Sequence, residues 1–173
     1  MARHGVFRVK RVTQIVEVLP IATKGILGDY TCTMSQRPIN IVVYSDDSSV
    51  RQSVIAGLGK QIATDLPAHE IHEFATADAL RLFIDRKGSD GKLKADLFIL
   101  DAEAVPEGGM GICRQLKDEV FECPPVLLIT ARADDAWLAT WSRAEAFVSH
   151  PIDPFTLAST VASLVRAPSL TIA

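Results

Sequence analysis

Three aspartates stand where apolar runs of the sequence end, and they are the first candidates for chemistry. Asp101 follows the apolar run 97–100, and Asp46 and Asp47 follow the run 39–44 closely. Apolar runs such as 97–100 are typical of strands buried on both faces of a parallel sheet. Ligands bind at the carboxyl ends of such strands, so Asp101 is placed for chemistry. The structural alternative is that Asp101 caps a turn or the following helix, as an aspartate after a strand often does.

The chemistry that this pattern favours is phosphoryl transfer assisted by a divalent cation. Carboxylates that are brought together repel one another, so the three aspartates need a cation to neutralise them. A site made of oxygen ligands suits Mg²⁺ better than Zn²⁺. The metal would neutralise the oxygens of the incoming group while a carboxylate serves as the nucleophile. Thr130 ends another apolar run and would place a hydroxyl opposite that carboxylate.

Regular alternation of strand and helix patterns predicts the elements that position these residues. Strands are expected at 39–44, 70–74, 97–100, 126–129 and 146–149, and helices at about 48–62, from 76, at 111–120, 134–143 and from 153 or 154 to 166. Five such alternations predict an α/β fold, a five-stranded parallel sheet with helices on both faces. The expected strand order is 2-1-3-4-5, the flavodoxin-like arrangement. That order brings the carboxyl ends of strands 1, 3, 4 and 5 together.

Four segments at the expected strand ends carry a family resemblance: IVVYSDDSSVR (41–51), DLFILD (96–101), VLLITA (126–131) and FVSHPIDP (147–154). On these segments the chain from about 38 to 166 resembles the CheY-like receiver domain of bacterial two-component response regulators. The resemblance implies a stand-alone response regulator in phosphorelay signal transduction. Such a protein takes a phosphoryl group from a histidine kinase, a phosphotransfer protein or a small donor. It is not a turnover enzyme, although slow autophosphatase activity is implied.

The resemblance also assigns roles to individual residues. It makes Asp101 the phospho-acceptor, Asp47 a direct Mg²⁺ ligand, Asp46 a ligand through water and the backbone carbonyl of Glu103 the third protein ligand. Thr130 matches the hydroxyl residue that binds the phosphoryl group, and Phe147 matches the aromatic residue whose rotamer follows it. His150 stands where receivers have lysine, and the resemblance predicts a cis His150–Pro151 bond.

Two departures from the family pattern keep other interpretations open. His150 is shorter than lysine and is only partly protonated near neutral pH. The loop after Asp101 is longer than usual and contains Gly108 and Gly109. A pseudo-receiver that binds or scaffolds without phosphorylation is therefore the alternative. A phosphohydrolase of the haloacid-dehalogenase type, using Asp101 and Glu103, fits poorly because its motif belongs on the first strand.

Two smaller hypotheses concern surface contacts. Glu103 and Arg132 each lie two residues past a strand end, and we hypothesise that they pair over the pocket when it is empty; two solvated side chains are the alternative. Trp137 and Trp141 share a face of the expected fourth helix. We expect Trp141 to anchor a partner or a homodimer at the surface of helix 4, strand 5 and helix 5; a packed tryptophan without a partner is the alternative.

The remaining sequence predicts a single domain with extensions. Residues 1–37 are expected to be an extension, disordered or forming one extra strand, with Met34 as a possible natural start; 38–167 form the receiver and 168–173 a short tail. Residues 1–37 carry six basic and two acidic side chains, and the rest carries twelve basic and nineteen acidic ones. That acidic body argues against direct nucleic-acid binding. No apolar run could span a membrane, and three scattered cysteines suit a cytoplasmic protein.

Overall fold

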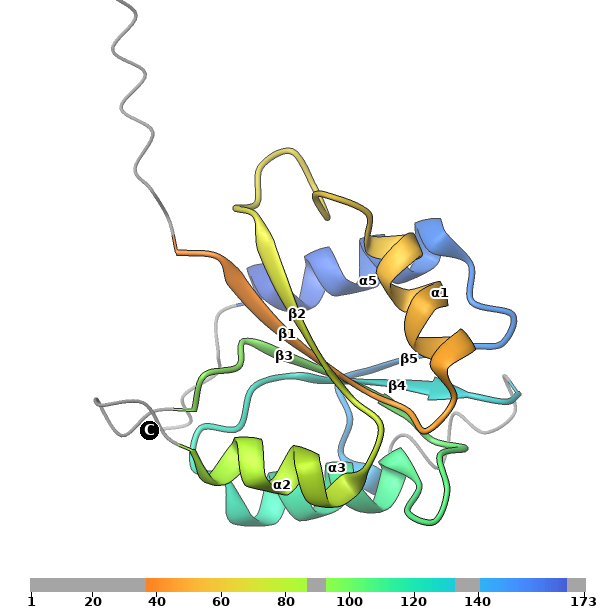
Figure 1. Cartoon of the computed structure of the whole chain (residues 1–173). Coiled ribbons are helices and arrows are strands. Elements are labelled where there is room, and N and C mark those ends of the chain that lie inside the picture. Colours follow the sequence, from red (N-terminus) through yellow and green to blue (C-terminus); the bar gives the residue numbers. More distant parts are fainter. Residues whose placement is uncertain (1–36, 87–92, 133–140, 168–173) are drawn as a thin grey trace, which may run out of the picture. The chain divides into compact units, whose positions relative to one another are not determined.

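A computed structural model describes residues 37–86, 93–132 and 141–167 of the chain. Within these ranges strands and helices alternate from residue 39 to residue 130, and a fifth strand and a last helix follow (Figure 1). The elements are β1 (Ile39–Tyr44), α1 (Ser48–Leu58), β2 (His69–Phe74), α2 (Ala77–Asp85), β3 (Leu97–Asp101), α3 (Gly109–Glu119), β4 (Val126–Thr130), β5 (Ala146–Ser149) and α5 (Pro154–Arg166).

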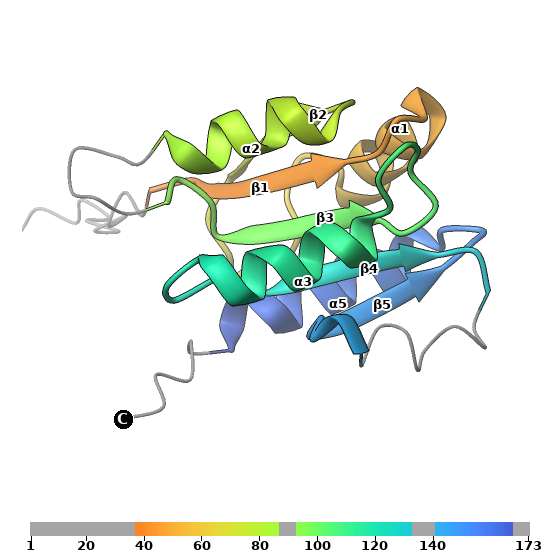
Figure 2. The same ribbon diagram turned by 90° about the horizontal axis from the view of Figure 1, so that it is seen from below.

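The five strands form one parallel sheet in the order β2-β1-β3-β4-β5, which confirms the predicted fold. Figure 2 shows β1, β3, β4 and β5 side by side with their carboxyl ends at the same edge. In the register, Ile41 lies opposite Leu97 and Val43 opposite Ile99. Asp101 lies opposite Ile129. The ends of β1, β3 and β4 therefore meet where the sequence predicted a site.

Burial explains why the apolar runs became central strands. Every residue of β3 and β4 is buried, and β1 has a single half-buried position. The edge strand β2 has no fully buried residue, and one of its sides has no neighbouring strand. Central strands of parallel sheets need apolar side chains on both faces, which is the pattern that the runs supplied.

Helices cover both faces of the sheet and divide the core into two clusters. Figure 1 shows α1 and α5 on one face and α2 and α3 on the other. Val54 of α1 and Leu157 of α5 pack on alternate residues of the strands, such as Ile41. On the opposite face, Leu80 and Leu116 pack on the residues between them. The period of two along each strand therefore decides which helix layer a residue faces.

The helices begin at residues that can bind their free amide groups. Asp47 caps α1, as one of the two residues expected there, and Thr76 caps α2. Asp153 caps α5, and Pro154 follows at the first helical position, where its fixed φ suits a helix. Helix α3 begins at Gly109, two residues earlier than predicted, with Gly108 as a cap that makes no side-chain hydrogen bond.

Several predictions fall outside the described residues. The extension 1–36, the loop centre at 87–92, most of the expected helix 134–143 with Trp137, and the tail 168–173 lie there. None of the helices in the described ranges has the length and apolar character of a membrane span.

Candidate functional site

Asp101 lies at the carboxyl end of β3 and is almost completely buried, with 3% of its surface exposed. Its carboxylate is held by two donors. The backbone N–H of Glu103 donates to Oδ1 at 3.0 Å, and the hydroxyl of Ser45 donates to Oδ2 at 2.7 Å. The following amide, of Ala102, donates to the carbonyl of Ile129 at 2.8 Å and keeps the chain against β4. Asp101 is thus a carboxylate oriented within the protein, with a loop directly after it.

Ser45 is the residue that the sequence interpretation missed. It is fully buried, and its Oγ also accepts the N–H of Asp47 at 3.1 Å. The register explains its position: Ile41 lies opposite Leu97, so the same offset sets Ser45 opposite Asp101. Ser45 can be identified by pairing the two apolar runs at that offset. Because side chains alternate between the two faces of a strand, the residue opposite Asp101 then lies on the same face as Asp101.

The neighbouring aspartates have different positions. Asp47 is exposed and accepts the N–H of Ser49 at 2.7 Å, as the N-cap of α1. Those hydrogen bonds from Ser49 hold the pKa of Asp47 below its usual value. Asp46 accepts the N–H of Val105 at 3.2 Å, so it faces the loop that follows Asp101. Of the two, Asp46 therefore contacts the segment that carries Glu103.

Arg51 fixes the turn that carries these residues. Its guanidinium donates to the carbonyl oxygens of Ser45 at 2.7 Å and of Asp46 at 3.3 Å. The same guanidinium pairs with Glu73 of β2 at 3.2 Å. The side chain of Arg51 is 16% exposed, so these bonds form in a sheltered position where they hold the backbone at the end of β1.

The long loop 102–108 is held by contacts with β1 and α2. The phenol of Tyr44, on β1, donates to the carbonyl of Glu107 at 2.7 Å, and burial raises the pKa of that phenol. Arg81 of α2 forms a bidentate ion pair with the Glu107 carboxylate and also contacts Gln115 of α3. The hydrogen bond from Arg81 lowers the pKa of Glu107. The longer loop is therefore an ordered part of the site.

Two glycines allow that loop to turn back over the end of β3. A Cβ atom at Gly108 would lie 2.6 Å from the carbonyl oxygen of Ala102. A Cβ at Gly109 would lie 2.6 Å from the carbonyl oxygen of Asp101 and 2.9 Å from the Cβ of Leu100. Because the atoms it would meet belong mainly to the backbone, no rotamer change can make room for it. Helix α3 can start this close to Asp101 only with glycine at these positions.

The last strands bring Thr130 and His150 to the same edge of the sheet, and Phe147 lies within β5. Thr130 is buried at the end of β4, and its hydroxyl donates to the carbonyl of Arg132 at 3.2 Å. Phe147, on β5, is 41% exposed. The N–H of His150 donates to the carbonyl of Thr130 at 2.9 Å, and the His150–Pro151 bond is cis, as predicted.

The structure tests one of the two predictions on surface contacts, the pair of Glu103 with Arg132, and leaves the partner role of Trp141 a prediction. No ion pair joins Glu103 to Arg132, although both residues are in the described part of the chain, so that expected pair is not formed. Trp141 is 55% exposed, but its ring lies 5.8 Å from the guanidinium carbon of Arg114. Arg114 also donates to the carbonyl of Trp141 at 3.1 Å. Since Arg114 belongs to α3, the ring of Trp141 contacts α3.

The acidic side chains at this edge of the sheet are the candidates for metal binding. Among the described residues, no group of three His, Cys, Asp or Glu side chains is arranged to hold a metal ion. Of the predicted residues Asp46, Asp47 and Asp101, Asp47 is engaged as the N-cap of α1. Asp46, Asp101 and the carbonyl of Glu103 still offer oxygen donors, the type that Mg²⁺ prefers.

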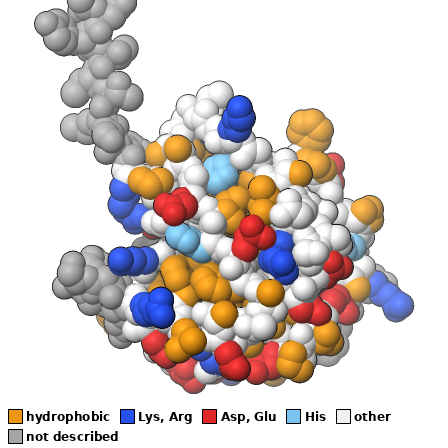
Figure 3. Space-filling model, in the orientation of Figure 1, with side chains coloured by type: hydrophobic (Ala, Val, Ile, Leu, Met, Phe, Trp, Pro, Cys, Tyr) orange, Lys and Arg blue, Asp and Glu red, His pale blue; other side chains and the backbone are white. Residues whose placement is uncertain are grey.

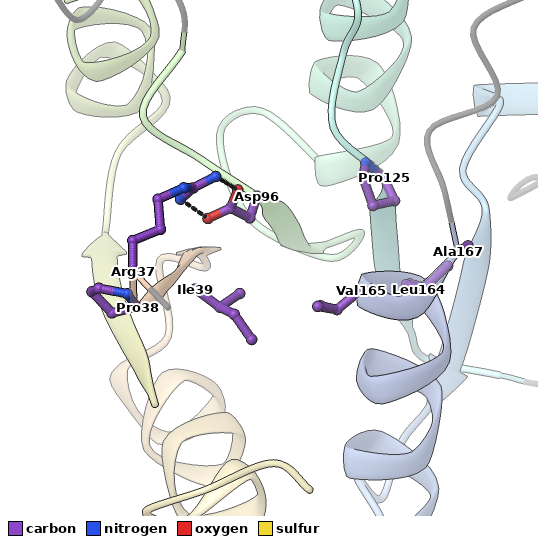
Figure 4. Close-up of a pocket in the computed structure, with 8 residues that line it drawn as sticks. All are labelled: Arg37, Pro38, Ile39, Asp96, Pro125, Leu164, Val165 and Ala167. Atoms are coloured by element: carbon purple, nitrogen blue, oxygen red, sulfur yellow. Dashed lines mark hydrogen bonds and ion pairs between the residues drawn. The ribbon is translucent and has the colours of Figure 1, made fainter. Parts of the chain in front are cut away.

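A cavity of about 270 Å³ lies at the opposite, amino-terminal edge of the sheet, at the start of β1 (Figure 4). Arg37 and Asp96 form a bidentate ion pair beside it, at 2.8 and 2.6 Å. Burial alone would raise the pKa of Asp96, but the hydrogen bonds from Arg37 and from the N–H of Asn40 lower it on balance. These donors satisfy the carboxylate, so the ion pair ties the start of β1 to the residue before β3.

The described surface carries charges of both signs. Figure 3 shows acidic, basic and hydrophobic side chains interspersed on one face of the molecule, without a continuous basic area on the described part of that face. Nucleic acid is attracted by clustered basic side chains. The surface in this view therefore offers it no such cluster.

Comparison with known proteins gives relatives of one kind. No family model matches the chain. Two proteins of Mycobacterium tuberculosis, from strains CDC 1551 and H37Rv, are each 50% identical over 135 residues. Those residues are 78% of this chain and 97% of each relative, and both are named as uncharacterized response regulatory proteins.

Solved structures share the fold at lower identity. The response regulator DrrB of Thermotoga maritima, an OmpR/PhoB homolog, matches with a TM-score of 0.58 and 21% identity over 72% of this chain. The match covers 51% of DrrB, so this chain spans about half of its length. The chemotaxis response regulator CheY4 of Vibrio cholerae matches with a TM-score of 0.60 and 17% identity, over 74% of this chain and 99% of CheY4. At these identities the likeness concerns the fold.

Proposed function

Because this chain belongs to the response regulators, the family of its 50% identical relatives, we propose that it is a stand-alone CheY-like receiver that accepts a phosphoryl group on Asp101. The observation that carries the proposal is the position of Asp101. It is a buried carboxylate at the carboxyl end of a central strand, oriented by a main-chain amide and a hydroxyl. Carboxylates in this position can act as nucleophiles.

In the proposed reaction, an oxygen of Asp101 attacks the phosphorus of a phosphohistidine or of a small phosphoryl donor. The bond between phosphorus and the donor's nitrogen or oxygen breaks, that atom keeps the electron pair, and an acyl phosphate remains on Asp101. The amide of Glu103 and the hydroxyl of Ser45 orient the attacking carboxylate. Slow attack of water on the acyl phosphate would return the free carboxylate, so the protein acts as an acceptor with weak autophosphatase activity.

The chain would hold Mg²⁺ with the carboxylates of Asp46 and Asp101 and the carbonyl of Glu103. When bound, the ion supplies positive charge that neutralises the phosphoryl oxygens. Asp47 is omitted from this ligand set because its carboxylate accepts the N–H of Ser49 at 2.7 Å. The set contains oxygen donors alone, in keeping with the preference of Mg²⁺.

Residues of β4 and β5 would transmit the change. The hydroxyl of Thr130 now donates to the carbonyl of Arg132, and we propose that it turns to a phosphoryl oxygen. Phe147, half exposed on the neighbouring strand, would change rotamer with it. His150, at the usual lysine position, would donate to the phosphoryl group when it is protonated.

A pseudo-receiver is the second candidate function. It is favoured by two features: Ser45 faces Asp101 with a hydroxyl, and His150 replaces the lysine. Such a protein would act as a binding or scaffolding module without phosphorylation. It keeps the fold and the partner surfaces but makes no use of Asp101 as a nucleophile.

The proposed partners follow from the proposed chemistry. A histidine kinase or a phosphotransfer protein would supply the phosphoryl group in the cytoplasm. A downstream protein, or a second copy of the chain, would bind at the surface formed by the fourth helix, β5 and α5. Nucleic acid and membranes are not proposed as direct partners.

Beryllofluoride, which imitates a phosphoryl group on a carboxylate, separates the two candidates. Amide spectra of the isotope-labelled chain would be recorded with MgCl₂, before and after addition of beryllofluoride. We expect shifts at Thr130, Phe147 and the loop after Asp101, and none in the matched Asp101→Asn variant. Spectra of the wild-type chain that do not change would favour the pseudo-receiver.

A further inference from the structure

Position 45 is the cross-strand neighbour of the proposed phospho-acceptor. The register sets Ile41 opposite Leu97 and Val43 opposite Ile99, and the next pair in the same phase is Ser45 with Asp101. Side chains that are paired in this way point to the same face of the sheet. The 2.7 Å bond from the Ser45 hydroxyl to Asp101 Oδ2 realises that pairing.

The contacts of Ser45 show what another side chain would do there. Its Oγ accepts the N–H of Asp47 at 3.1 Å while it donates to Asp101, and it is fully buried. A carboxylate at position 45 could accept the same amide, because that role needs an oxygen lone pair. It could not donate to Asp101, and it would add a negative charge where serine adds none.

The second aspartate after Ser45 does not compensate. Asp47 is turned away to the N-cap of α1, and no group of three acidic or metal-binding side chains forms among the described residues. A cation at Asp101 would therefore meet the carboxylates of Asp46 and Asp101, with the neutral hydroxyl of Ser45 beside them. That hydroxyl also occupies a lone pair of Asp101 Oδ2.

We propose that Ser45 is the residue that sets how tightly this pocket holds a divalent cation, and that its hydroxyl keeps the affinity low. The inference rests on the proposed Mg²⁺-dependent function and adds a residue that determines its metal dependence. This pocket needs less positive charge for stability than a pocket with three carboxylates, because both carboxylate oxygens of Asp101 already accept a hydrogen bond. Activation of this protein then depends on high Mg²⁺ concentrations.

The test compares Ser45→Asp with Ser45→Asn, which has nearly the same size and no charge. MgCl₂ would be titrated into the full-length chain in a calorimeter, without any phosphoryl donor. One further carboxylate near the ion contributes at least about 1 kcal/mol even when screened, and more in a sheltered site. We therefore expect Ser45→Asp to bind Mg²⁺ at least about fivefold more tightly than Ser45→Asn. Equal affinities would overturn the proposal.

Thermal unfolding of the two variants is a second measurement that can refute the proposal independently. Two facing carboxylates repel, so Ser45→Asp is expected to melt at a lower temperature than Ser45→Asn without metal and to gain more from MgCl₂. An aspartate variant that stays unfolded at every MgCl₂ concentration, or failure of both variants to fold, would contradict the proposal. Failure of the wild-type chain to take up a phosphoryl group would refute the proposed function, while this titration would still decide the role of Ser45.

Discussion

Substitution of Gly109 by alanine tests whether α3 really starts against the backbone of Asp101. The added Cβ would lie 2.6 Å from the Asp101 carbonyl oxygen, 2.8 Å from its carbonyl carbon and 2.9 Å from the Cβ of Leu100. Carbon atoms in favourable contact lie about 3.5–4.0 Å apart. Helix α3 must therefore shift away from β3, or the end of β3 must move.

The expected cost follows from the kind of atoms involved. Overpacking a tight interior costs about 1–3 kcal/mol, and backbone atoms cannot relax by changing rotamers. Gly111, on the same helix, is the matched control, because a Cβ there would meet nothing within 4 Å. Gly111→Ala should stabilise the protein by about 0.5–1 kcal/mol, since alanine loses less conformational entropy in a helix. The two variants should therefore differ by about 1.5–4 kcal/mol.

Urea unfolding followed by circular dichroism measures this difference. Both variants should show the slope of the wild-type transition, with the midpoint lowered for Gly109→Ala and slightly raised for Gly111→Ala. A Gly109→Ala protein that is as stable as Gly111→Ala would refute the described packing of α3 on the end of β3. Glycine would then not be required at this position of the loop.

Four further substitutions, in three experiments, test other contacts of the molecule. Asp47→Ala should lower the free energy of unfolding, because the cap of α1 is lost, but leave the Mg²⁺ affinity unchanged. Asp46→Ala should weaken Mg²⁺ binding. Weaker Mg²⁺ binding in Asp47→Ala and unchanged binding in Asp46→Ala would show that Asp47 is the ligand. Burial lowers the pKa of His69, whose Nδ1 is buried without a hydrogen-bond partner. The stability of the wild-type protein should therefore fall as the pH drops below about 6.5. His69→Gln should make the stability less dependent on pH between about pH 5 and 7. Asp96→Asn should destabilise the protein at neutral pH, and less so in high salt, which screens the ion pair with Arg37. The pKa of Asp96 is lowered in the folded protein, so its contribution to stability is present above about pH 4 and is lost as the carboxylate is protonated. The effect of the substitution should therefore be smaller near pH 3. Urea titrations across pH and salt would measure both effects, and equal pH profiles for wild type and variant would contradict either one.

The fold was predictable because its main signals are local. Unbroken apolar runs marked the buried strands, and the regular alternation with helices predicted the parallel order that the structure confirms. The position of Asp101 followed from the same signal, since a polar residue that directly ends such a run stands at the carboxyl edge of the sheet.

The details of the site depend on contacts between distant segments, which local patterns do not specify. Asp46 and Asp47 are adjacent acidic residues that local spacing does not distinguish. In the structure, Asp47 accepts a hydrogen bond from the first turn of α1, whereas Asp46 accepts one from the loop after Asp101. Ser45 was missed because its role depends on how two strands are paired. The ion pair of Arg81 with Glu107 joins α2 to the loop across a distance in sequence that no spacing rule covers.

Phosphoryl transfer to Asp101 is the measurement that tests the proposed function most directly. The full-length chain would be incubated with a small phosphoryl donor such as acetyl phosphate and MgCl₂, and the intact mass would be followed with time. We expect addition of a single phosphoryl group to the wild-type chain, loss of that group in hydroxylamine, and no addition to Asp101→Asn. A wild-type chain that stays unmodified at high MgCl₂, or an Asp101→Asn variant that is modified equally, would contradict the proposed role of Asp101.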